Sequence, residues 1–163
     1  MKAETIIVRA QAAADALGIP LTDAVDLARK CPEVLVRAEG AVDAQIDVLT
    51  ELLALKRSEV QALIVRTPRL LTSKPETLRS TVDTLAATLE VDVDTALRMA
   101  LRFPPLFYLN PQPVREKMMR AAGLLGMEFA AMRDVVVRMP TLATRESVAF
   151  ARKVRLGMRI ARA

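Results

Sequence analysis

The sequence contains no histidine, no tryptophan and only one cysteine, Cys31. A single cysteine excludes an internal disulfide and any zinc site built from several thiolates. The lack of histidine removes the commonest metal ligand and general base of proteins. The sequence also offers no glycine-rich phosphate loop and no nucleophile next to a base. We therefore predict that the protein is not an enzyme and that it uses no metal, no cofactor and no small-molecule substrate.

Aromatic residues make up only 3% of the chain, although 52% of its residues are hydrophobic. A core of Leu, Val, Ile, Met and Ala with few glycines favours helices, because Ala and Leu lose little side-chain entropy in them. Charged residues interrupt every apolar run well before the roughly 20 residues that span a bilayer. The N-terminus resembles neither a signal peptide nor a convincing transit peptide. These features predict an all-α protein with no membrane partner.

Four prolines recur at a fixed interval of 36 residues, and a period of this length is typical of helical-repeat proteins. A basic residue stands two positions before each proline, and a branched aliphatic residue stands two positions after it. The prolines are Pro32, Pro68, Pro104 and Pro140; the basic residues are Lys30, Arg66, Arg102 and Arg138; the aliphatic residues are Val34, Leu70, Leu106 and Leu142.

Each period predicts a long helix, a short helix and a tight 3₁₀ turn that starts at the proline. A leucine fifteen positions before each proline, followed twice by glycine, predicts the end of the long helix. The short helix should end two residues before the proline, because proline disfavours the α conformation of its predecessor. The expected helices are 3–17, 22–30, 40–54, 58–66, 75–89, 94–102, 111–126, 131–138 and 145–161.

Polar residues ten positions before the prolines predict the N-caps of the short helices. These are Thr22, Ser58 and Asp94, with Ala130 in the fourth period. Ser58 and Gln61 have the spacing of a capping box. We expect Asp94 to be the cap of its helix, with Asp92 two residues outside it, so that the two carboxylates do not form a metal site.

The pattern as a whole predicts an α-solenoid of about four 36-residue repeats, in which residues 1–163 form a single domain. Residues 145–163 are expected to form a basic C-terminal helix that caps the last repeat.

The net charge of +5 comes entirely from the C-terminal segment. Residues 1–144 contain 18 basic and 18 acidic side chains, whereas residues 145–163 contain six basic side chains and one acidic. Arg152, Arg155, Arg159 and Arg162 fall on one stripe of a helix, with Lys153 beside them. This stripe predicts either a solvated terminal cap or a surface that binds phosphates or an acidic protein.

Lys30, Arg66, Arg102 and Arg138 are the second group of candidate nucleic-acid-binding residues. In a solenoid they would form a row of cations that can follow a phosphate backbone. The same residues can instead cap the C-terminal carbonyls of the short helices, where a cation also interacts favourably with the helix dipole. Phe103, Phe107 and Tyr108 are expected in the core, with base stacking as the alternative.

The segment Arg-Thr-Pro-Arg-Leu-Leu at 66–71 and the equivalent segments at 30–35 and 102–107 resemble the repeat of the mitochondrial transcription termination factor (mTERF) family. The resemblance covers nearly the whole chain. It implies two α-helices and one 3₁₀ helix per repeat, stacked as a superhelix with a basic groove that binds DNA or RNA in mitochondria or plastids.

We expect a mitochondrial protein, with a plastid as the alternative, that binds RNA in preference to duplex DNA. Because the charge is concentrated in one terminal segment, a few phosphate contacts should position it, as in a ribosomal or ribosome-associated component. Other proteins of a ribonucleoprotein assembly are further expected partners. The alternatives are a protein-interaction scaffold and a DNA-binding transcription termination factor.

Overall fold

A computed structural model describes residues 3–36, 40–146, 149, 151–152 and 154–155. These residues form α-helices and 3₁₀ helices, and none of them lies in a β-strand. No described helix has the length and apolar character that crossing a bilayer requires. By its internal contacts the chain divides into two compact units, Met1–Thr77 and Leu78–Ala163, and each is described by itself.

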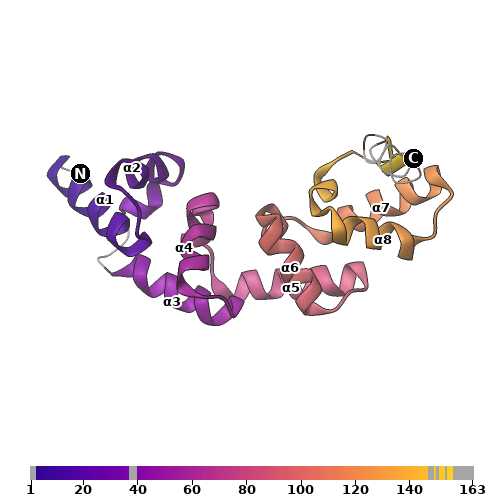
Figure 1. The fold of residues 1–163 in the computed structure, drawn as a ribbon, viewed down its shortest axis with the longest axis horizontal. Helices are drawn as coiled ribbons and strands as arrows, with labels where there is room; N and C mark the ends of the chain where they lie inside the picture. Colours follow the sequence, from indigo (N-terminus) through magenta and orange to yellow (C-terminus); the bar gives the residue numbers. More distant parts are fainter. Residues whose placement is uncertain (1–2, 37–39, 147–148, 150, 153, 156–163) are drawn as a thin grey trace. The chain divides into compact units, whose positions relative to one another are not determined.

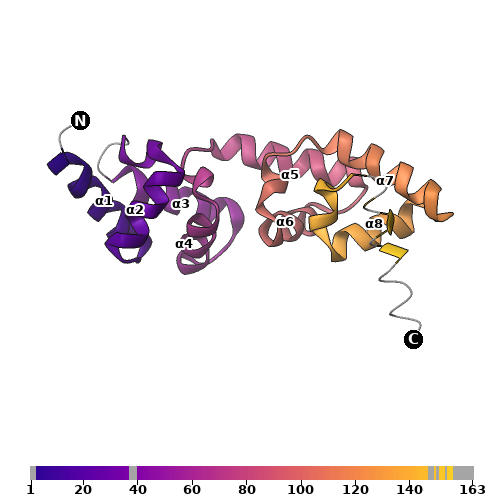
Figure 2. The ribbon, with the colours of Figure 1, turned by 90° about the horizontal axis from the view of Figure 1, so that it is seen from above.

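The first unit holds two rounds of long helix, short helix and 3₁₀ turn (Figure 1). Helices α1 and α2 lie side by side in both views, and α3 packs on both α1 and α4 (Figures 1 and 2). The elements are α1 (Ala3–Leu17), α2 (Leu21–Lys30), η1 (Pro32–Leu35), α3 (Ala41–Leu53), α4 (Arg57–Arg66) and η2 (Pro68–Leu71).

The second unit contains the same order of elements twice more. Helix α5 begins at the end of the first unit, and α8 packs on α7 and on α6. The elements are α5 (Pro75–Leu89), α6 (Val93–Arg102), η3 (Pro104–Phe107), α7 (Pro111–Leu125), α8 (Phe129–Arg138) and η4 (Pro140–Thr144).

The core is built from residues that recur at the same place in each period. The aliphatic residue two positions after each proline is at most 3% exposed. The predicted apolar stripe of the long helices is also buried. It consists of Val42, Ile46, Leu49, Leu78, Val82, Leu85, Val114 and Met118. Four residues predicted to lie in the core are half-buried instead: Phe103, Tyr108, Leu125 and Val135.

The ends of the helices are set by local backbone chemistry. Each long helix ends on the expected leucine, and the next residue adopts a positive φ: Gly18 at 65°, Ala54 at 51°, Glu90 at 57° and Gly126 at 62°. Only glycine reaches this left-handed region without a steric cost. Two of the four turns therefore place a non-glycine residue in a strained backbone conformation.

The predicted N-caps of the short helices were wrong by two residues. The caps are Pro20, Lys56, Asp92 and Glu128 rather than the residues ten before each proline. The long helix stops at its leucine and a two-residue link follows, so the short helix starts earlier than the polar pattern suggested. Ser58 and Gln61 do not form a capping box, because the Gln61 side chain donates to the Ala16 carbonyl at 2.8 Å.

Candidate nucleic-acid interface

The four repeated basic residues lie where the sequence predicted, at the last position of each short helix. Lys30 ends α2 and Arg66 ends α4 in the first unit, while Arg102 ends α6 and Arg138 ends α8 in the second. All four are exposed. A cation here interacts favourably with the helix dipole, so position alone does not separate capping from ligand binding.

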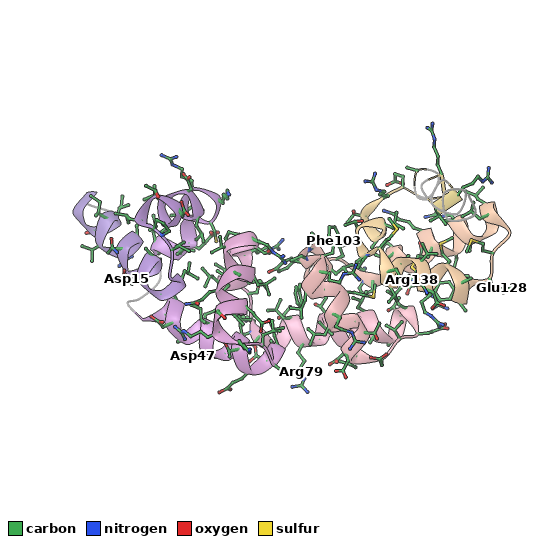
Figure 3. All side chains as sticks on the ribbon, in the orientation of Figure 1. Asp15, Asp47, Arg79, Phe103, Glu128 and Arg138 are labelled. Carbon is green, nitrogen blue, oxygen red and sulfur yellow. The ribbon has the colours of Figure 1, made fainter. Side chains whose placement is uncertain are left out.

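Arg102 caps a neighbouring helix rather than its own. Its Nη2 donates to the carbonyl oxygen of Arg138, 2.9 Å away, which is one of the unpaired carbonyls at the end of α8. In Figure 3 the two ends that this bond joins can be found by the labels Arg138, at the end of α8, and Phe103, the residue after the end of α6. The Arg138 side chain forms no hydrogen bond or ion pair with any described residue of its unit. The Arg102 side chain thus links the end of α6 to the end of α8.

The C-terminal segment is described at five helical positions, 149, 151, 152, 154 and 155. Ala151 and Val154 are 7% and 5% exposed, whereas Arg152 and Arg155 face solvent. This division agrees with the amphipathic pattern expected for the segment. Lys153, Arg159 and Arg162, which complete the predicted basic stripe, lie outside the described residues.

An open depression lies beside these cations in the second unit. Its volume is about 520 Å³. It is lined by Phe103, Thr141, Thr144, Arg145, Glu146 and Ala149. The depression combines a half-buried aromatic ring, two hydroxyl groups and an exposed guanidinium group, which are groups that contact bases, sugars and phosphates. Glu146 is held at 3.6 Å from the Lys117 ammonium group, which offsets its negative charge.

The other two aromatic residues of this region do not line the depression. Phe107 is 2% exposed and belongs to the core, as expected, while Tyr108 is half-buried. Of the three aromatic rings, Phe103 is therefore the one that the depression offers to a ligand.

Several basic side chains elsewhere in the described structure have carboxylate partners. Arg57 forms ion pairs with Asp43 and Asp47, and Arg115 forms one with Glu90 at 2.7 Å. Arg115 also stacks on the Phe129 ring. By contrast, no described carboxylate pairs with Arg138, Arg145, Arg152 or Arg155. These four described arginines are exposed.

The two aspartates near the start of α6 have exchanged roles relative to the prediction. Asp92, not Asp94, caps the helix: its carboxylate accepts from the Thr95 backbone N–H at 2.7 Å and from the Thr95 hydroxyl at 2.8 Å. These hydrogen bonds, chiefly the one from the hydroxyl, lower the pKa of Asp92. Both carboxylates remain solvent-exposed, and no metal-binding cluster of His, Cys, Asp and Glu occurs in the described part of the chain.

Cys31 is buried, at 6% exposure. Its thiol donates to the Glu33 carboxylate at 3.3 Å. Glu33 has a lowered pKa, caused first by a hydrogen bond from its own backbone N–H and then by this thiol. The contact fixes the start of the first 3₁₀ turn.

Sequence reasoning missed a repeated polar position on the long helices, 23 residues before each proline. Arg9 donates to the Leu35 carbonyl at 2.6 Å, and Gln45 donates to the carbonyls of Leu70 and Ser73. Lys117 holds the same position and pairs with Glu146. Each side chain ties a long helix to the segment at or just after the 3₁₀ turn of its own period. The spacing was visible in the sequence, but the residue types differ too much to form a motif.

A second set of links joins successive periods. The Gln61 amide donates to the carbonyl of Ala16, and Arg133 donates to the carbonyl of Glu90 at 3.3 Å. Gln61 and Arg133 occupy the same position, seven residues before a proline, and both reach the end of the preceding long helix. These contacts make α4 and α8 part of the C-terminal caps of α1 and α5, the long helices of the preceding periods.

Repeated pairs of α-helices joined to 3₁₀ turns define a helical-repeat protein. The mTERF family model matches residues 1–148, and the chain belongs to this family. The mTERF proteins are nucleic-acid-binding helical-repeat proteins of mitochondria and plastids. A comparison with curated proteins gives no match.

Proposed function

We propose that this protein binds RNA through phosphate contacts made by its second unit, as a component of a mitochondrial ribonucleoprotein assembly such as the ribosome. The observation that carries the proposal is the group of exposed arginines without carboxylate partners: Arg138, Arg145, Arg152 and Arg155. Unpaired guanidinium groups repel one another, and a phosphate backbone relieves that repulsion. The four periods are proposed to stack as a solenoid that carries this surface.

The chemistry of the depression favours a single-stranded segment over a duplex. Phe103 presents a ring on which an unpaired base can stack, and such a face is inaccessible to bases inside a duplex. Arg145 lies at the same depression and supplies a partner for the adjoining phosphate. Family membership supports a nucleic-acid partner, and this local chemistry supports RNA as its type.

The test is the salt dependence of binding by the full chain to a single-stranded RNA and to a duplex DNA. For a single strand, each neutralised phosphate contributes about −0.7 to the slope of the logarithm of the binding constant against the logarithm of the salt concentration. The R145Q/R152Q double variant should therefore reduce the slope by about 1.4. The matched control is R29Q/R57Q, which removes the same charge from arginines that already have carboxylate partners.

The possible outcomes separate the candidate functions. A flat salt response of the unmodified chain would overturn the proposal and favour a protein-interaction scaffold. Tighter binding to the duplex would favour a DNA-binding termination factor. Equal effects of the two double variants would mean that total charge, rather than this surface, drives binding.

A further inference from the structure

The outward face of α7 differs from the same face of the other long helices. Two of its solvent-facing positions are Met119 and Gly123, and the side chain of Met119 is 54% exposed. The equivalent positions, 36 residues apart, are mostly polar in the other periods and are exposed in all of them. They are Gln11 and Asp15 on α1, Asp47 and Glu51 on α3, and Asp83 and Ala87 on α5.

Gly123 has no role inside the molecule that explains its presence. It lies within α7, and a Cβ added there would meet nothing within 4 Å. Glycine within a helix costs about 1 kcal/mol relative to alanine. A glycine that no intramolecular contact requires allows another surface to approach the helix backbone closely.

The residues around Gly123 form a mixed apolar and charged surface. Leu124 is 56% exposed, and Glu116 and Arg120 are exposed with no ion pair to any described residue. At 100° per residue, these side chains and Met119 all fall within 140° of the helix circumference. We call this surface, made of Glu116, Met119, Arg120, Gly123 and Leu124, the α7 face.

We propose that the α7 face binds a second copy of the same chain, with the two α7 helices antiparallel across a twofold axis. One acid and one base give the face zero net charge, so two copies do not repel one another. The faces of α3 and α5 carry carboxylates at the equivalent positions and would repel. A phosphate backbone is a poor occupant, because the face has no excess of cations.

If the twofold axis of the dimer passes level with the midpoint between residues 121 and 122, the side chains of one α7 face match those of the other. In that pairing Met119 of each copy lies opposite Leu124 of the other, which covers the two most exposed apolar side chains of the helix. Arg120 of each copy lies opposite Gly123 of the other, where the missing side chain leaves room for the arginine stem. A homodimer with this symmetry uses the same surface on both copies.

The experiment measures the mass of the full chain by sedimentation equilibrium over a range of concentrations. We expect a monomer–dimer equilibrium for the unmodified chain. M119D installs the residue that α3 and α5 carry at the same position, so it is compatible with the helix, and it should weaken dimerisation more than about tenfold. D83N on α5 is the control and should leave the equilibrium unchanged.

Disulfide formation between engineered cysteines tests the geometry. In a Cys31→Ser background, a mixture of M119C and L124C chains should form a mixed disulfide on oxidation, whereas D83C with L124C should not. A chain that remains monomeric at every concentration would overturn the proposal, as would a dimer that M119D leaves intact. A monomeric chain that instead crosslinks through L124C to another protein would assign the face to that protein.

The proposal does not depend on RNA binding. M119D changes none of the arginines assigned to RNA binding and should leave RNA affinity per chain unchanged, so failure of one proposal does not imply failure of the other.

Discussion

Replacing Ala54 with glycine should stabilise the protein, although it removes a methyl group. Ala54 follows the last residue of α3 with φ of 51°, a left-handed conformation that costs an L-residue about 1–2 kcal/mol. Its side chain is exposed, so the substitution opens no cavity. Glycine removes the steric cost but adds about 0.4–1 kcal/mol of unfolded-chain entropy. The expected net gain is about 0.5–1 kcal/mol.

The reverse change serves as the matched control. Gly126 occupies the equivalent position after α7 with φ of 62°, and a Cβ added there would meet nothing within 4 Å. Gly126→Ala therefore introduces only the backbone cost, and we expect a loss of about 0.5–1 kcal/mol.

The assay is thermal unfolding followed by circular dichroism at the helix band, with the midpoint temperature read for each variant. For a chain of this size, 1 kcal/mol corresponds to about 2–4 °C in Tm. The reasoning would be refuted if A54G lowered the midpoint, or if A54G and G126A shifted it in the same direction.

Two further predictions concern contacts at the helix ends. The pKa of Asp92 is lowered, so its carboxylate stabilises the folded state above its unfolded pKa of about 3.8, and this contribution is lost as the pH falls through the lower folded value. D92N keeps an oxygen that can accept from the Thr95 backbone N–H but loses the acceptor for the Thr95 hydroxyl, and it should make stability less dependent on pH in this range. An unchanged acid unfolding curve would contradict the assignment. Q61A should lower the free energy of unfolding by about 1–2 kcal/mol, because the part-buried Ala16 carbonyl loses its donor. The control is Q112A, which changes an exposed glutamine. Equal midpoints of thermal unfolding for the two variants would show that the link contributes nothing.

Much of the fold could be predicted because the prolines and leucines act through local physics. Proline ends the short helix before it and starts the 3₁₀ turn, so the 36-residue spacing fixes those boundaries. The leucine at the end of each long helix was recognisable because its position repeats. The apolar stripes were equally clear, because burial at helical spacing needs no knowledge of the partner surface.

The N-caps and the candidate site were less predictable because they depend on residues distant in sequence or on small backbone differences. Asp92 and Asp94 are both good caps, and only the exact end of α5 decides between them. Gln61 has the sequence spacing of a capping box but is recruited by a carbonyl in the preceding period. Arg102 and Arg138 looked equivalent, and the bond between them gives them different roles.

The difference between Arg102 and Arg138 affects how charge-removal experiments are interpreted. A variant in which all the repeated cations are neutralised together would lose RNA affinity for two reasons, since the Arg102 change also uncaps α8. Comparing Arg102→Gln with Arg138→Gln separates them, because only the first should lower the unfolding midpoint.

The links from Gln61 and Arg133 to the preceding long helix also bear on how the chain is made and degraded. Helices α1 and α5 emerge from synthesis before the donors that their C-terminal carbonyls receive from the short helix of the next period. The first and third periods are therefore incomplete until the next period has followed them. Chains stopped between Leu17 and Gln61 expose that defect, so proteases should remove them faster than chains stopped after the link has formed.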